Sequence, residues 1–113
     1  MAYAVTQLGK TEPAFSHPGF PDKTGEFLCV CCSSELFSSS EKFESGSGWP
    51  SFSSPISKEA IATNIDLSHG MRRIEVLCSN CKAHLGHVFE DGPEPTLKRY
   101  CINSVALRFV KND

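Results

Sequence analysis

Apolar and polar positions alternate over short stretches of the chain, which predicts strands rather than long helices. The clearest alternation is near the C-terminal end, where Val105, Leu107 and Phe109 share one face and Ser104, Ala106 and Arg108 share the other. Shorter apolar stretches at residues 26–31, 73–77 and 87–89 predict three further strands. The first enters a tight turn, and the last ends at the turn 91–93. No segment keeps a long 3.6-residue period, so we expect a mainly antiparallel β fold with minor helix.

Helical signals are few and short. Residues 1–25 contain several prolines and glycines and predict an irregular N-terminal arm that includes short helical segments. Residues 38–48 are rich in serine and glycine and predict a loop. Residues 54–61 begin with a serine cap and a proline in the first turn, which predicts a short helix. The length of 113 residues fits one domain over 1–113.

Composition and charge exclude several classes of function. Hydrophobic residues make up 40% of the chain and charged residues 21%, with a net charge of -2. Nothing in this balance indicates a nucleic-acid or membrane partner. No apolar run approaches the roughly 20 residues that cross a bilayer. The first residues lack a basic region followed by an apolar one, so we expect no signal peptide and a cytoplasmic location.

Six cysteines are the informative excess, and four of them form two Cys-x-x-Cys pairs. The pairs are Cys29 with Cys32 and Cys78 with Cys81. Two intervening residues let a tight turn aim both sulfurs at one point, and two such turns make a closed tetrahedral site that suits one structural zinc ion. The pairs are separated by far more than the roughly 15–20 residues of the common spacing, so the fold must bring distant segments together.

Other readings of the cysteines stay open at this point. Six cysteines in a secreted chain would indicate three disulfides, but the chain shows no export signal. A thioredoxin-type redox pair would need a strand–helix–strand pattern, which surrounds neither pair. Four thiolates suit iron as well as zinc.

Two cysteines, Cys31 and Cys101, remain after the four candidate ligands. If Cys101 lies on a strand, Arg99 and Asn103 share its face, because side chains repeat every two residues. A cation and an amide donor beside the sulfur favour the thiolate. The alternative is an ordinary buried core cysteine, and spacing alone does not separate the two.

Histidines and one aromatic loop add further candidates. His84 and His87 lie close together, and either imidazole is a candidate proton donor near neutral pH. His69 is expected in a surface loop, and His17 belongs to no motif. Trp49 and Phe52 flank a proline in a glycine-containing loop. They either wall a small apolar pocket or anchor the loop to the core.

Taken together, these segments resemble methionine sulfoxide reductase B, the family that reduces one epimer of methionine sulfoxide. The resemblance runs from about Thr11 to Phe109. It is carried by TEP at 11–13, the cysteine turns at 29–32 and 78–81, LF at 36–37, KF at 42–43, SGSGWPSF at 45–52, HLGHVF at 84–89, DGP at 91–93 and RYCINS at 99–104.

The resemblance implies two antiparallel sheets and a zinc ion held by the four paired cysteines. It implies that Cys101 attacks the R epimer of methionine sulfoxide in proteins or peptides. It also implies that Trp49 packs on the substrate methyl group, with the remaining candidates around the reacting atoms: His84, His87, Arg99 and Asn103. Many members carry a resolving cysteine at the position of Ser47, where a serine cannot form a disulfide.

The expected reaction leaves Cys101 as a sulfenic acid, with His87 as the first candidate proton donor and His84 as the second. Regeneration then uses either Cys31 as a candidate resolving thiol followed by thioredoxin, or an external thiol acting directly, which we prefer. We expect a monomer. A zinc-ribbon binding module is the rival from another class, but it gives no reason for Arg99 and Asn103 around a spare cysteine. A metal-dependent hydrolase conflicts with a closed four-thiolate site.

Overall fold

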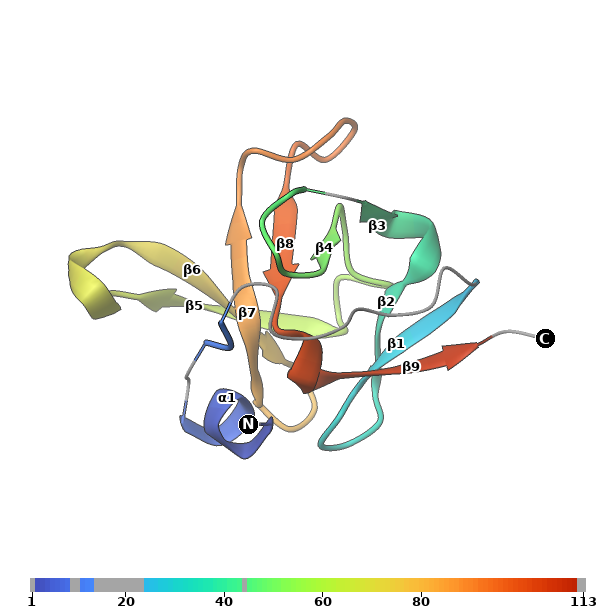
Figure 1. Ribbon diagram of the computed structural model, residues 1–113, viewed down its shortest axis with the longest axis horizontal. Coiled ribbons are helices and arrows are strands. Elements are labelled where there is room, and N and C mark those ends of the chain that lie inside the picture. The colour runs from blue at the N-terminus through green and yellow to red at the C-terminus, as the bar shows by residue number, and fades with distance from the viewer. Residues whose placement is uncertain (1, 9–10, 14–23, 44, 112–113) are drawn as a thin grey trace.

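The computed structural model describes residues 2–8, 11–13, 24–43 and 45–111, and two antiparallel sheets dominate it (Figure 1). A three-stranded sheet has the order β2-β1-β9, and a six-stranded sheet has the order β3-β4-β8-β7-β6-β5. This confirms the mainly antiparallel β fold. The strands are β1 Gly25–Cys29, β2 Glu35–Ser38, β3 Lys42–Phe43, β4 Ser51–Phe52, β5 Ile61–Asp66, β6 Arg73–Cys78, β7 His84–Phe89, β8 Arg99–Ile102 and β9 Leu107–Lys111.

Aromatic side chains from both sheets meet in the core. Phe27 of β1 and Phe37 of β2 both contact Phe52 of β4, with ring centroids 5.1 and 4.4 Å apart. All three are fully buried, together with Leu85 and Ile102 of the larger sheet. Burial of a side chain of this size contributes about 1.5–3 kcal/mol, so this cluster holds the two sheets together.

One short helix, α1 Ala2–Leu8, lies in the predicted arm and packs against β7. Val5 is fully buried there, which anchors a helix too short to be stable alone. Residues 14–23 of the arm, with His17, lie outside the described part of the chain, and β1 already begins at Gly25. Within the described ranges, no helix is both long and apolar enough to cross a membrane.

The helix predicted over residues 54–61 is wrong. The chain makes successive turns there, and Ile61 already begins β5. The Ile56 N–H donates to Leu36 O at 2.8 Å, and the Ala60 N–H donates to Ser57 O at 3.1 Å. Bonds to a distant strand and to a tight turn satisfy the backbone, so no helical nucleus forms.

The C-terminal alternation predicts one strand too long. Ser104–Ala106 form a 3₁₀ turn, η3, and β9 begins only at Leu107. Ser104 and Ala106 are both buried, whereas Leu107 is buried and Arg108 exposed as the alternation predicted. The turn redirects the chain from the larger sheet to the smaller one (Figure 1).

A β-bulge sets the orientation of the histidines on β7. Residues three apart on a regular strand point to opposite faces. Here Leu77 pairs with His84, Val76 with Gly86 and Glu75 with His87, so Leu85 is the extra residue on β7. The bulge therefore brings both imidazoles to one face, with their ring centroids 5.4 Å apart. Gly86 is required beside it, because a Cβ there would collide with the carbonyl of Cys101.

Candidate functional site

Cys101 and His87 face each other across two neighbouring strands. They are direct partners in the β7–β8 pair, and Ser51 of β4 is the partner of Cys101 on its other side. Opposite side chains in antiparallel strands have Cβ atoms about 4.5–5.5 Å apart. The sheet register therefore places the two residues directly opposite each other on β7 and β8.

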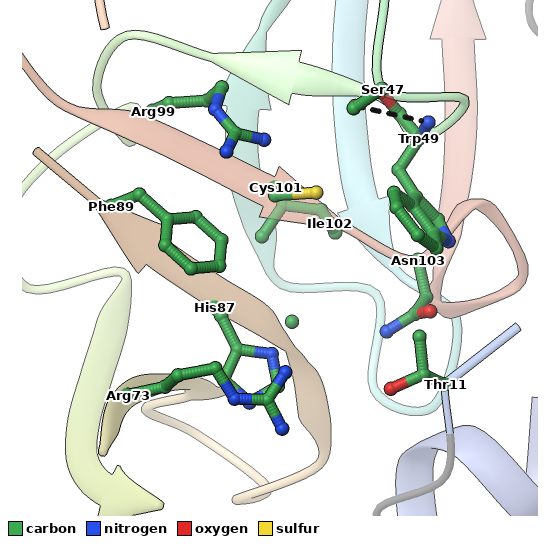
Figure 2. A pocket seen from close by; sticks show the side chains of 11 residues that line it. Thr11, Ser47, Trp49, Arg73, His87, Phe89, Arg99, Cys101, Ile102 and Asn103 are labelled. Carbon is green, nitrogen blue, oxygen red and sulfur yellow. Dashed lines mark hydrogen bonds between the residues drawn. The ribbon is translucent and has the colours of Figure 1, made fainter. Parts of the chain in front are cut away.

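This pair lines a pocket of about 180 Å³ (Figure 2). Its walls come from β6, β7 and β8, from the loop before β4 and from the N-terminal segment. The lining residues are Thr11, Ser47, Trp49, Arg73, Gly86, His87, Phe89, Arg99, Cys101, Ile102 and Asn103.

Burial dominates the titration of the thiol. It raises the pKa of Cys101, while the charge of Arg99 and hydrogen bonds with Ser47 and Arg99 oppose the rise. The sequence predicted a stabilised thiolate from the cation of Arg99 and the amide of Asn103. The structure corrects this, because desolvation of the sulfur outweighs its favourable neighbours. The free protein therefore holds Cys101 as a thiol, and a base is needed to remove its proton.

Arg99 is fixed beside the thiol by two contacts. Its guanidinium donates to Asp91 through Nε at 2.8 Å and Nη2 at 3.2 Å. It also lies over the Phe89 ring, 4.7 Å from the centroid. This ion pair lowers the pKa of Asp91 and keeps the cation at the pocket wall (Figure 2).

His87 is held by a carboxylate that the sequence did not single out. Its Nε2 lies 2.7 Å from Oδ2 of Asp66, at the end of β5. Burial lowers the pKa of His87, and the bond to Asp66 opposes the fall. The imidazole of His87 is therefore neutral at neutral pH, and its Nδ1 takes no part in the bond to Asp66. No motif marks Asp66, because its distance from His87 is set by the pairing of β5, β6 and β7.

His84 lies behind the pocket. Its Nδ1 is 2.7 Å from Oε2 of Glu75, and its Nε2 is buried without a hydrogen-bond partner. It contacts the ring of His87 but is not among the lining residues. Of the two histidines, only His87 therefore lines the pocket together with Cys101.

Trp49 and Asn103 line the pocket, and both are held by the segment around Glu12. The Trp49 indole N–H donates to Glu12 O at 2.9 Å, and the Glu12 N–H donates to Asn103 Oδ1 at 3.0 Å. The Asn103 amide also donates to Leu85 O. Both hydrogen bonds of the Asn103 side chain therefore go to backbone groups, whereas the sequence predicted that its amide would lie beside the Cys101 sulfur.

Phe52 is not among the residues that line the pocket, and its position matches the alternative in which it anchors the loop to the core. Its side chain is fully buried between Phe27 and Phe37. Trp49 and Phe52 diverge because only Phe52 lies on a strand whose face turns to the core.

Glu12 is itself a buried carboxylate that caps η3. Its two oxygens accept the N–H groups of Ser104 and Val105 at 2.9 and 3.0 Å. We predict that Glu12→Gln lowers the free energy of unfolding by about 1–3 kcal/mol, because an amide NH₂ cannot accept one of these bonds. Urea unfolding checks this, with Glu35→Gln on the exposed surface as control. Trp49 is the only tryptophan in the sequence, so its fluorescence reports directly on the same wall.

The four paired cysteines meet away from this pocket. Their sulfur atoms all lie within 4.8 Å of one another, and the Cys29–Cys81 and Cys32–Cys78 distances are both 3.6 Å. A tetrahedral zinc ion with Zn–S bonds of about 2.3 Å needs sulfurs about 3.8 Å apart. The donor set therefore fits a four-thiolate metal site.

The two remaining sequence candidates lie in different places. Cys31 is exposed in the turn after β1, where Gln7 Nε2 lies 3.5 Å from its sulfur, and it does not line the pocket. Ser47 lines the pocket beside Cys101, and its Oγ accepts the backbone N–H of Trp49 at 3.4 Å (Figure 2).

Comparison with known proteins gives consistent matches. The family model for the SelR domain matches residues 1–111. The chain is 53% identical over 112 residues to a peptide methionine sulfoxide reductase MsrB from Hahella chejuensis, covering 98% of this chain and 81% of the relative. It is 56% identical over 109 residues to the protein of that name from Thioalkalivibrio sulfidiphilus, covering 96% and 80%. The protein of that name from Escherichia coli strain K12 is 52% identical over 114 residues, covering 100% and 83%.

Proposed function

Because the chain belongs to the methionine sulfoxide reductase B family, we propose that it reduces methionine sulfoxide in proteins or peptides to methionine, with the R epimer as substrate. The observation that carries this proposal is the pairing of Cys101 with His87 in a small pocket. A thiol and a neutral imidazole side by side form an activated nucleophile. The apolar face of Trp49 suits the methyl group of the substrate.

The reaction moves one oxygen atom and two electrons. His87 accepts the Cys101 proton, and the sulfur attacks the electrophilic sulfur of the sulfoxide. His87 then gives the proton to the sulfoxide oxygen, which is transferred to Cys101. The thioether leaves as methionine and Cys101 becomes a sulfenic acid, so the sulfoxide sulfur is reduced and the cysteine oxidised. Proton transfer by a placed imidazole contributes about 10²–10⁴-fold to such a step.

Arg99 supports the charged forms of this pathway. Its cation lowers the pKa of Cys101 against the effect of burial and stabilises the thiolate during attack. Asn103 closes the pocket beside Trp49, and His84 packs against His87 from behind. In this proposal Asn103 helps to exclude water from the sulfur, and His84 helps to hold the His87 ring in place.

Zinc is our proposal for the four-cysteine cluster, with Cys29, Cys32, Cys78 and Cys81 as ligands. The ion would be structural, because four thiolates leave no position for substrate. It would cross-link the turns that follow β1 and β6 and belong to different sheets.

Regeneration of Cys101 uses an external thiol directly in our proposal. A first thiol condenses with the sulfenic acid and releases water, and a second thiol, as in thioredoxin, reduces the mixed disulfide. Cys31 is exposed and does not line the pocket, whereas a disulfide with Cys101 needs Cα atoms within roughly 7 Å, which supports the direct route. The need for free thiols supports a reducing cytoplasmic setting, and we propose a monomer.

An assay on separated R and S epimers of peptide methionine sulfoxide, with and without thioredoxin, tests this function. We expect reduction of the R epimer at least about 100-fold faster than the S epimer, because a fixed pocket admits one arrangement of methyl, oxygen and side chain. Equal rates would contradict the proposed specificity. Peptide mass spectrometry after one turnover without reductant tests regeneration, and a Cys31–Cys101 cross-link would refute the direct route.

A further inference from the structure

The side chain that completes the reactive pair lies on a third strand. Asp66 ends β5, which β7 and β6 separate from β8, and its Oδ2 lies 2.7 Å from His87 Nε2. Its other oxygen, Oδ1, accepts the N–H of Ser68 at 2.9 Å. Arg73 Nη2 lies 3.4 Å from the same Oδ2. The carboxylate is thus fixed at both oxygens before any substrate binds.

Asp66 decides which nitrogen of His87 can react. A carboxylate accepts hydrogen bonds, so Nε2 must carry the hydrogen of a neutral ring. Nδ1 then holds the lone pair that can take a proton. Cys101 is the direct strand partner of His87, and both residues line the pocket.

We propose that Asp66 is the positioning residue of a Cys101–His87–Asp66 triad, which fixes the tautomer of His87 and balances the charge that the ring gains during proton transfer. This inference rests on the proposed function, since it acts through His87 as proton carrier. A weak nucleophile is generally activated by a neighbouring base, and a carboxylate on the far side of that base holds it in position.

The charges around His87 show why a carboxylate is needed. Burial opposes a protonated ring, as do the guanidinium of Arg73 from β6 and the neighbouring His84. Arg99 of β8 adds a further cation at the pocket, and the carboxylate of Glu75 is engaged by His84. Asp66 is therefore the anion in direct contact with His87 among the described residues.

Nitrogen NMR of the wild-type protein gives the first test. With ¹⁵N-labelled histidine, we expect the neutral His87 ring as the Nε2–H tautomer, and a dominant Nδ1–H tautomer would overturn the proposal. Because this measurement needs no variant, it holds even if substitutions impair folding.

Asp66→Asn gives the second test, with Glu59→Gln as a control that removes the same charge from an exposed site. In Asp66→Asn we expect a lower pKa for His87 and a kcat reduced about 10- to 100-fold, with KM changed less than about threefold. Asp66→Glu should restore part of kcat, and the control should match the wild type. A wild-type kcat with an unchanged His87 titration in Asp66→Asn would overturn the proposal.

His87→Gln separates this inference from the function on which it rests. If His87→Gln loses turnover and Asp66→Asn does not, the triad fails and the proposed proton carrier stands. If His87→Gln keeps wild-type turnover, both the carrier and the triad are wrong. Loss of R-epimer reduction in both variants, with zinc content retained, supports the triad.

Discussion

Cys101→Ser is expected to abolish reduction of methionine sulfoxide, by at least about 1,000-fold, even with excess dithiol. Serine keeps the shape of the side chain, but its hydroxyl cannot accept the sulfoxide oxygen as a sulfenic acid. Cys101 is half-buried on β8 and hydrogen-bonds to Arg99, so the smaller oxygen should leave the pocket intact. The measurement is a single-turnover assay of methionine formation.

Cys31→Ser is the matched control for that experiment. Cys31 is exposed and outside the pocket, so its variant should form one equivalent of methionine at the wild-type rate. Substantial methionine formation by Cys101→Ser would show that another group takes the oxygen. A sulfenic-acid probe such as dimedone should label the wild type after turnover and leave Cys101→Ser unlabelled.

Loss of the four-cysteine site is expected to have the second largest effect. Cys78→Ser should release the metal and lower the free energy of unfolding by about 5 kcal/mol, because structural zinc contributes strongly to folding. That loss is comparable with the total stability of a small domain, about 5–15 kcal/mol. Cys29 and Cys78 are fully buried, so the Cys29 sulfur and the new serine hydroxyl at position 78 would be left in an apolar environment without a metal ligand bond.

Zinc content and thermal unfolding measure this effect together. Cys31→Ser again serves as control, because Cys31 lies in the same turn but outside the cluster, and it should retain one metal ion. A Cys78→Ser protein that keeps both its metal and its unfolding temperature would rule out the site. A bound metal other than zinc in the wild type would correct the identity of the ion and leave the geometry intact.

Local patterns were sufficient for the parts of the fold that depend on neighbours in sequence. Alternation located β6 and the inward faces of Leu107 and Phe109, and two-residue spacing marked both cysteine turns. The same patterns failed where contacts with strands distant in sequence determine the local structure. Residues 54–61 bond to Leu36 rather than forming a helix, and Phe52 is held in the core by aromatic rings from β1 and β2.

By itself the sequence determined the β class, the four candidate metal ligands and Cys101 as one of two spare cysteines, because residue type and short spacing are written directly in it. Only the tertiary structure decided that His87 lines the pocket with Cys101 and His84 does not, because that depends on the pairing of β7 with β8. It also decided that burial raises the pKa of Cys101 despite Arg99, since desolvation is a property of the whole packed site. Asp66 came from the structure alone, because strand pairing and not sequence distance brings its carboxylate to His87.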